Sequence, residues 1–181
     1  LAGEFAMKVA LARQIRIPSD WGLEVGILAE VFRKCSVQRV CQIELCENYD
    51  HKHQELSADD PSRGLHRMVV DISTNLFRNL AAVGVQFDAG FLNTLSIAYL
   101  REAQDSVARY SDEARINALG FDRHDEEVTV ETFTSALRSA GLAFVRDPMG
   151  RPLIPNWSRV TAALPDFLSD LRYALRQDLD G

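Results

Sequence analysis

The chain lacks several features that would assign it quickly to a class. No apolar run approaches the roughly 20 residues that a membrane-spanning helix needs, and no basic segment followed by an apolar one opens the sequence. Three cysteines, Cys35, Cys41 and Cys46, form neither an even disulfide framework nor a CxxC metal pair. We therefore expect reduced, buried thiols, a cytoplasmic location and no membrane contact.

Basic charge is also scarce. The 20 lysines and arginines are outnumbered by 26 aspartates and glutamates, which gives a net charge of −6, and no long basic run occurs. Because nucleic-acid binding requires a basic face, we do not expect a nucleic-acid partner. The 181 residues, 46% hydrophobic and 25% charged, are typical of a soluble globular protein with one sizeable core.

Periodicity predicts a mainly α protein with one or few strands. Apolar spacing predicts helices over residues 3–15, from Ser19 or Asp20 to Lys34, and near 63–83, 89–110, 112–119, 126–140 and 157–178. Gly84, Gly120 and Gly141 fall where C-terminal caps are expected, and Asn156 can cap the last helix. Alternating side chains from Arg39 to Leu45 predict a single strand.

A polar loop with two histidines follows this predicted strand. His51 and His53 are two residues apart, so both project to the same side of an extended segment. Imidazole is a good ligand for ions such as Mn²⁺ or Zn²⁺, and Lys52 can neutralise a phosphate as a point charge. Two histidines do not make a complete metal site, and spacing alone favours a solvated loop.

Three sequence features together point to a known family. They are Leu1-Ala2-Gly3-Glu4-Phe5-Ala6, the Trp21-Gly22-Leu23-Glu24-Val25-Gly26 helix start, and His51. With the interval between the first two, they resemble the C-terminal part of the catalytic core in the retaining glucosyl-3-phosphoglycerate synthases. These are GT-A fold glycosyltransferases that move glucose from UDP-glucose to 3-phosphoglycerate.

The resemblance implies roles for individual residues. The backbone at Leu1 would lie beside the donor sugar, Glu24 would hydrogen-bond the sugar hydroxyls, and His51 would complete a site for a divalent metal, Mg²⁺ or Mn²⁺. Phosphate contacts from the same loop would come from Lys52, His53 and Gln54. The chain departs from the family here, because the alignment needs about one extra residue before His51 and actinobacterial members have arginines at the positions of Lys52 and Gln54. No catalytic residue is assigned.

The resemblance also implies an organisation. Residues 1–56 would be the C-terminal segment of the GT-A core, a Rossmann-like α/β fold, and residues 57–181 a helical C-terminal region. The N-terminal nucleotide-binding half, with its DxD motif, is absent, so we expect a fragment of a longer enzyme that is inactive alone. The complete enzyme would use a nucleotide sugar donor and a phosphorylated small-molecule acceptor, and would form a homodimer.

Alternatives remain at this point. A mannosyl donor, as in mannosyl-3-phosphoglycerate synthases, or another phosphorylated acceptor fits the same motifs, and so does a non-catalytic helical module for interaction or dimerisation. The only D-x-D, Asp178-Leu179-Asp180, lies at the C-terminus and is discounted as a metal site. We expect His66 to be a surface or boundary residue and His124 to belong to a charged helix start.

Overall fold

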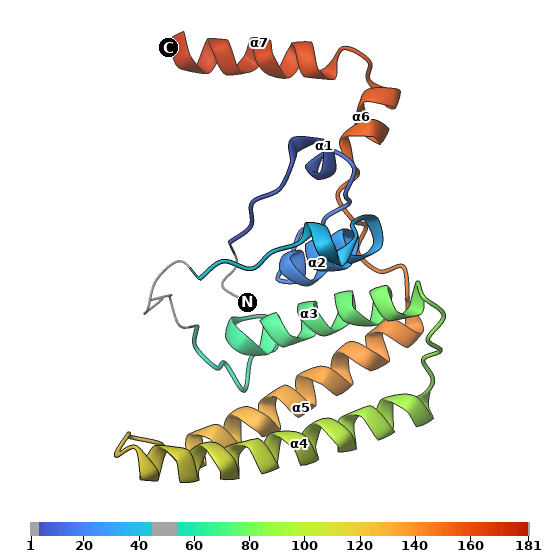
Figure 1. Ribbon diagram of the computed structural model, residues 1–181. Coiled ribbons are helices and arrows are strands. Elements are labelled where there is room, and N and C mark those ends of the chain that lie inside the picture. The colour runs from blue at the N-terminus through green and yellow to red at the C-terminus, as the bar shows by residue number, and fades with distance from the viewer. Residues whose placement is uncertain (1–3, 45–53, 181) are drawn as a thin grey trace.

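The computed structural model describes residues 4–44 and 54–180, and the elements within them are helical (Figure 1). The helices are α1 (Val9–Ala12), α2 (Leu23–Lys34), the short 3₁₀ helix η1 (Val37–Arg39), α3 (Gly64–Ala81), α4 (Ala89–Ile116), α5 (Arg123–Arg146), α6 (Trp157–Ala163) and α7 (Phe167–Asp180). The prediction of a mainly α protein is confirmed. The wider GT-A context stays a prediction.

The four longer helices before residue 147 are stacked in layers. α3 packs against both α2 and α5, and α5 packs against both α3 and α4, so the order of the layers is α2, α3, α5, α4 (Figure 1). The last two helices, α6 and α7, pack on each other, and α7 is set apart from α3, α4 and α5. The body of the chain is therefore α2–α5, with α2 on its outer side.

Small residues on α5 let the layers approach closely around an aromatic core. Ala136 and Ala140 are completely buried, and Phe77 of α3 is only 1% exposed. Phe77 and Phe144 have ring centroids 5.9 Å apart, and Phe87, which precedes α4, lies 5.1 Å from each of them. Such tilted and edge-on pairs stabilise a core beyond the area they bury.

Gly141 has a different role from the predicted one. It lies inside α5 and is buried, so the prediction of a C-terminal cap is wrong. A Cβ at this position would lie 2.6 Å from Leu92 Cδ2 of α4, so the absence of a side chain is what lets the two helices meet. Gly120 is not the cap of α4 either, because that helix ends at Ile116 with Asn117 as its cap. Gly84, in the left-handed conformation at φ 96°, does follow α3 closely.

The predicted strand over residues 39–45 is wrong for the part that the structure describes. Val37–Arg39 forms the 3₁₀ helix η1, and residues 40–44 have no regular secondary structure; Leu45 lies outside the described residues. Alternation can become a strand only when a neighbouring strand supplies hydrogen bonds. The described residues contain one isolated bridge, between Ile17 and Ile154, and no ladder that this segment joins.

Several helix boundaries also differ from prediction. α2 begins at Leu23 with Gly22 as its N-cap, rather than after Ser19 or Asp20, and α5 extends beyond the predicted 126–140 to Arg123–Arg146. The first predicted helix shortens to Val9–Ala12. The helices predicted over 89–110 and 112–119 are one continuous α4, because Val107 and Ala114 are both buried and keep the same face against the body. The helix predicted over 157–178 is divided into α6 and α7 by Leu164-Pro165-Asp166, and proline cannot continue a helix from within.

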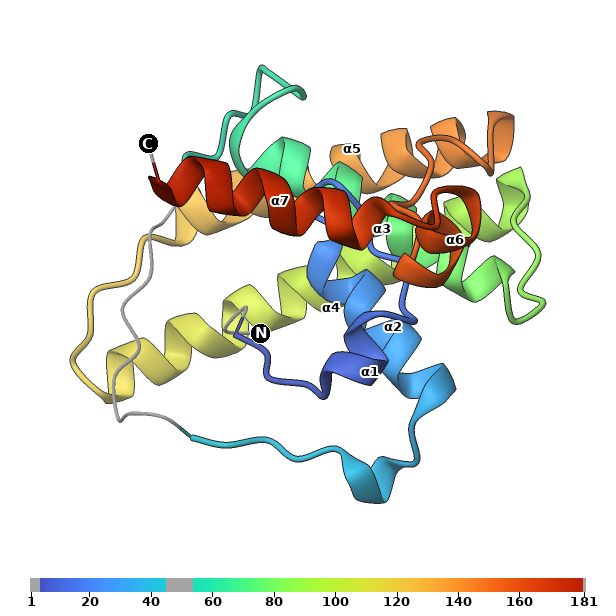
Figure 2. The ribbon, with the colours of Figure 1, turned by 90° about the horizontal axis from the view of Figure 1, so that it is seen from above.

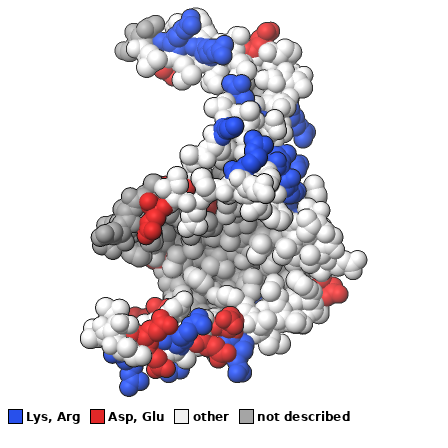
Figure 3. Space-filling model, viewed as in Figure 1, with Lys and Arg blue, Asp and Glu red and all other residues white. Residues whose placement is uncertain are grey.

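The surface has no extended face of a single charge in the view of Figure 3. Acidic and basic side chains are intermixed at the foot of the molecule, and a basic group lies above it (Figure 3). Seen from above, α7 projects across the body (Figure 2). Among the described residues, no helix combines the length and the apolar character that a membrane crossing requires.

Candidate functional site

The residues predicted to form the site divide between described and undescribed parts of the chain. Leu1, His51, Lys52 and His53 lie outside the described residues. Glu24 and Gln54 are described, and both side chains are half-buried. The geometry of the site therefore rests mainly on the helix start that carries Glu24.

Glu24 lies in the first turn of α2, as predicted. The N-cap of this helix is Gly22, and the Asp20 carboxylate organises the turn before it by accepting the Gly22 N–H at 2.9 Å. Glu24 itself has no hydrogen-bond or ion-pair partner among the described residues. The helix dipole favours an acidic side chain in this first turn, and without a described partner the Glu24 carboxylate is free to accept hydrogen bonds from a ligand.

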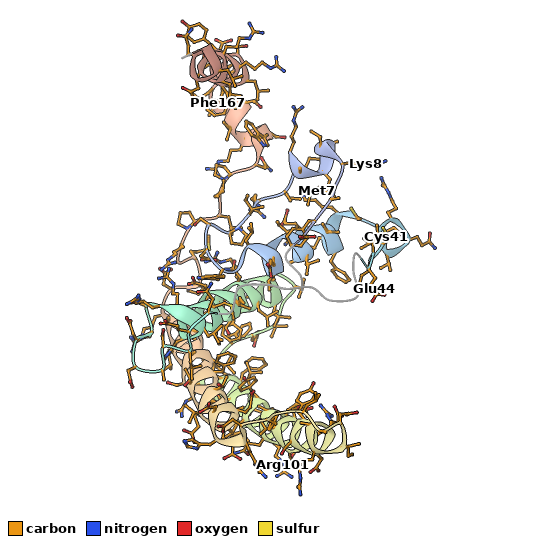
Figure 4. The ribbon with its side chains drawn as sticks, turned by 90° about the vertical axis from the view of Figure 1, so that its left-hand side faces the viewer. Met7, Lys8, Cys41, Glu44, Arg101 and Phe167 are labelled. Carbon is orange, nitrogen blue, oxygen red and sulfur yellow. The ribbon has the colours of Figure 1, made fainter. Side chains whose placement is uncertain are left out.

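A cleft of about 560 Å³ begins one turn further along the same side of α2. Ile27, Leu28 and Val31 form its wall on the helix. Met7 and Lys8 of the N-terminal segment and Cys41 from the segment after α2 lie on the same side of the molecule, where they line the cleft (Figure 4). In the same view Arg101 of α4 and Phe167 of α7 lie at opposite ends, far from it. This volume is in the range of small-molecule sites.

Asn75 of α3 supports the turn before Glu24 from behind. Its side chain is buried, and Nδ2 donates to Asp20 Oδ1 at 3.1 Å and to the Asp71 carbonyl oxygen at 3.0 Å. Arg151, from the segment after α5, lies 3.9 Å from Asp20 Oδ2 and 3.6 Å from Asp71 Oδ1. Arg67 Nε donates to Asp71 Oδ2 at 2.9 Å. The two carboxylates are thus balanced by two guanidinium groups.

The residues after α5 also hold the segment that leads to this turn. Ile154 N–H donates to the Ile17 carbonyl at 2.9 Å, and Trp157 N–H donates to the Arg13 carbonyl at 3.2 Å. Asn156 Nδ2 donates to the Gln14 carbonyl, while its Oδ1 caps α6 as predicted. The C-terminal region is therefore part of the support of the candidate site.

The loop that follows the two predicted loop histidines is tied to the start of α3. Leu65 N–H donates to the Glu55 carbonyl at 2.8 Å, and His66 N–H donates to the Leu56 carbonyl at 3.2 Å. Gly64 adopts a left-handed φ of 55°, and a Cβ there would lie 2.2 Å from the Glu55 oxygen. This pairing fixes where the chain leaves the undescribed segment, close to Gln54.

The structure also places the two histidines, His66 and His124, for which we expected no functional role. His66 is 6% exposed, so it is buried rather than at the surface, and its Nδ1 lies 3.3 Å from the Ala58 carbonyl. His124 lies at the exposed start of α5, where Asp122 caps the helix by accepting the N–H groups of His124 and Asp125. That helix-start assignment is confirmed.

Metal-ligand chemistry is sparse in the part of the chain that the structure describes. No group of three histidine, cysteine, aspartate or glutamate side chains there is arranged to hold a metal ion. Cys35 and Cys41 are free thiols, one half-buried and one exposed, so the expectation of burial is wrong for Cys41. The predicted metal ligand, His51, lies outside the described residues, as does Cys46.

Two curated proteins are similar to this chain along nearly its whole length. A glucosyl-3-phosphoglycerate synthase from Persephonella marina is 44% identical over 178 residues, which are 98% of this chain and 44% of that protein. A glucosyl-3-phosphoglycerate synthase from Methanococcoides burtonii is 43% identical over 180 residues, which are 99% of this chain and 44% of that protein. This chain is related to the glucosyl-3-phosphoglycerate synthases. The resemblance seen in the sequence motifs is thereby confirmed.

The similarity to these synthases has a defined extent. The chain spans 44% of the length of each of the two relatives, and the similarity runs through the helical region after residue 56 as well as through the motifs. No protein-family model matches the chain, and no solved structure matches it significantly. The relation therefore rests on these two synthases.

Sequence reasoning missed the support behind Glu24. Asp71 and Asn75 are four residues apart, so they lie on one face of α3, and both are buried. Their spacing of four residues is the signal that the sequence contains, whereas their burial is known only from the structure. Their partners, Asp20 and Arg151, are far away in the sequence, and only the fold brings them together.

Proposed function

We propose that this chain forms the donor-sugar side of a glycosyltransferase that moves glucose from UDP-glucose to 3-phosphoglycerate with retention of configuration. The observation that carries the proposal is the 43–44% identity to two glucosyl-3-phosphoglycerate synthases over 98–99% of the chain. The donor, the acceptor and the stereochemistry rest on the motif resemblance. The rest of the donor and acceptor sites would come from the part of the longer relatives that this chain does not match.

Glu24 is the residue that we assign to the donor sugar. A carboxylate can accept hydrogen bonds from two neighbouring hydroxyl groups at once, and bonds to a charged acceptor are strong and directional. The half-buried position of Glu24 in the first turn of α2, next to the cleft and without a described partner, suits that role. Such a clamp orients the hexose for attack, which is a positioning contribution.

His51 is the residue that we assign to a divalent metal. When bound, Mg²⁺ or Mn²⁺ would neutralise the leaving diphosphate as a Lewis acid. A neutral imidazole nitrogen is an accepted ligand for such ions. Because the described residues hold no three-ligand group, the other ligands would come from parts of the protein beyond them.

The test measures steady-state glucosyl transfer by the complete protein that carries this chain. We expect Glu24→Gln to raise the KM for UDP-glucose and leave the KM for 3-phosphoglycerate unchanged, with a loss of about 10- to 100-fold in kcat/KM, because hydrogen bonds to charged groups contribute about 1.5–3 kcal/mol. His51→Ala should raise the metal concentration that gives half-maximal rate.

The matched control is Glu131→Gln, at an exposed glutamate of α5. It should leave all kinetic constants unchanged. Unaltered donor kinetics in Glu24→Gln would remove the clamp, and an unaltered metal requirement in His51→Ala would remove the metal assignment. Faster turnover of GDP-mannose than of UDP-glucose would reassign the donor, and no turnover with any donor would favour a helical interaction module.

A further inference from the structure

The turn that precedes Glu24 is held by one buried amide. Asn75 is 2% exposed, and its Nδ2 bridges the Asp71 carbonyl of α3 and Oδ1 of Asp20. The same Asp20 oxygen accepts the Gly22 N–H, so a single carboxylate oxygen closes the turn and also fastens it to α3. The N-terminus of α2 thus takes its position from Asn75.

Close packing of Gly22 on Asn75 also holds the turn before Glu24 in place. A Cβ on Gly22 would lie 1.9 Å from Asn75 Nδ2 and 2.4 Å from its Cγ, so the glycine backbone rests directly on the amide. No residue other than glycine fits at this position unless Asn75 moves. Because interiors are closely packed, a change in the amide displaces the turn rather than leaving it in place.

The surrounding charges favour one arrangement of this cluster. The side chains of Asp20 and Asp71 are only 12% and 7% exposed, and Arg151 is close to both. A buried carboxylate without partners is costly, so Asp20 stays where both Asn75 and Arg151 can reach it. Glu24 has no described partner of its own, and its orientation is therefore inherited from the helix start.

We propose that Asn75, acting through Asp20, is a positioning residue for the donor sugar. It holds the N-terminus of α2 so that the Glu24 carboxylate faces the hydroxyl groups of the hexose. The inference rests on the proposed function, since it assigns a support to the clamp proposed there. Through Asn75 of α3, the helical region would thus contribute to a site whose motifs lie before residue 56.

A double-mutant cycle in the complete protein tests this coupling. We expect Asn75→Ala to raise the KM for UDP-glucose on the order of tenfold, because small misplacements of a positioning group are costly, with the KM for 3-phosphoglycerate unchanged. In a Glu24→Gln background the same substitution should give no further rise. A residue that only stabilises the fold would lower the unfolding temperature without this dependence on Glu24.

Asn79→Ala is the matched control. Asn79 lies one turn further along α3, and its Nδ2 donates to the Asn75 carbonyl at 2.9 Å, with no contact to Asp20. Asn79→Ala removes an amide from the same helix without removing the bond to Asp20, so the KM for the donor should not change.

Amide hydrogen exchange at Gly22 gives a readout besides activity. The exchange should become faster in Asn75→Ala and stay unchanged in Asn79→Ala.

The outcomes separate this inference from the proposed function. If Glu24→Gln leaves the donor KM unchanged, the clamp itself is wrong. If Glu24→Gln raises it while Asn75→Ala does not, or if Asn75→Ala raises it equally in both backgrounds, the positioning role is overturned. If Asn75→Ala fails to fold, Asp20→Asn and Asp20→Ala are compared instead. The asparagine keeps an acceptor oxygen, so it should raise the KM for the donor less than the alanine does. Equal increases in KM would refute the inference.

Discussion

Asp60 organises the loop between the undescribed segment and α3. Its Oδ1 accepts the Ser62 hydroxyl at 2.6 Å and the Ser62 N–H at 3.0 Å. These bonds favour the ionised carboxylate and lower the pKa of Asp60 below 3.8. The bond from the Ser62 hydroxyl has the larger effect and the bond from the Ser62 N–H the next. A folded-state pKa below the unfolded value means that Asp60 contributes stability above about pH 4, and that this contribution is lost as the pH falls through the folded pKa.

Ser62→Ala should raise the pKa of Asp60 toward 3.8, because it removes the larger of the two causes and keeps the backbone bond. Carboxyl carbon chemical shifts followed by NMR between pH 2 and about pH 6 would measure both midpoints. A midpoint of Asp60 at or above 3.8 in the unaltered chain would contradict the expectation.

Single residues also show where sequence reasoning ends. The motif placed Glu24 in the first turn of a helix, and the structure agrees, because capping and periodicity are local properties. Asn75 was missed because its bond to Asp20 joins positions 55 residues apart.

At the level of elements, helices were predictable and their interruptions less so. Periodicity found helices α2, α3 and α5, since one apolar face per helix was enough, but it placed the start of α2 too early and made α5 too short. The strand over residues 39–45 failed because alternation says nothing about whether a partner strand exists. The division between α6 and α7 was signalled by Pro165, which the periodic pattern around it obscured.

Gly141→Ala should destabilise the pair formed by α4 and α5. The new methyl group would lie 2.6 Å from Leu92 Cδ2, and overpacking of this kind costs about 1–3 kcal/mol. Gly120→Ala is the matched control, because nothing lies within 4 Å of its Cβ position, and its effect should stay within about 1 kcal/mol. Urea unfolding followed by circular dichroism measures both; equal free energies of unfolding would show that Leu92 moves aside at little cost.

At the level of the whole molecule, the C-terminal helices differ in how they join the body. The start of α6 is bonded to the N-terminal segment through Trp157 and Asn156. α7 packs on α6, where the rings of Trp157 and Phe167 lie 5.8 Å apart, and it stands away from α3–α5 in Figure 1. Stability should therefore depend on residues 151–157 far more than on α7.

Two truncations test this division. A chain that ends at Leu164 loses α7 only, and its unfolding temperature should fall by less than about 4 °C, which corresponds to about 1 kcal/mol for a chain of this size. A chain that ends at Gly150 also loses the Arg151 ion pairs and the Ile17–Ile154 bridge, and should fall further. Thermal unfolding by calorimetry measures both, and equal decreases would place the support in α7 instead.

The bond between Asn156 and Gln14 spans 142 positions of the chain. During synthesis, residues 13–20 therefore leave the ribosome long before residues 151–157, which hold them in place. Helices α3–α5 have time to pack first, since local contacts form before distant ones. Until residues 151–154 have emerged, the turn before Glu24 has Asn75 behind it but neither Arg151 nor the Ile154 bridge. A stalled or prematurely ended nascent chain would thus hold a packed helical body in which the turn before Glu24 is only loosely held.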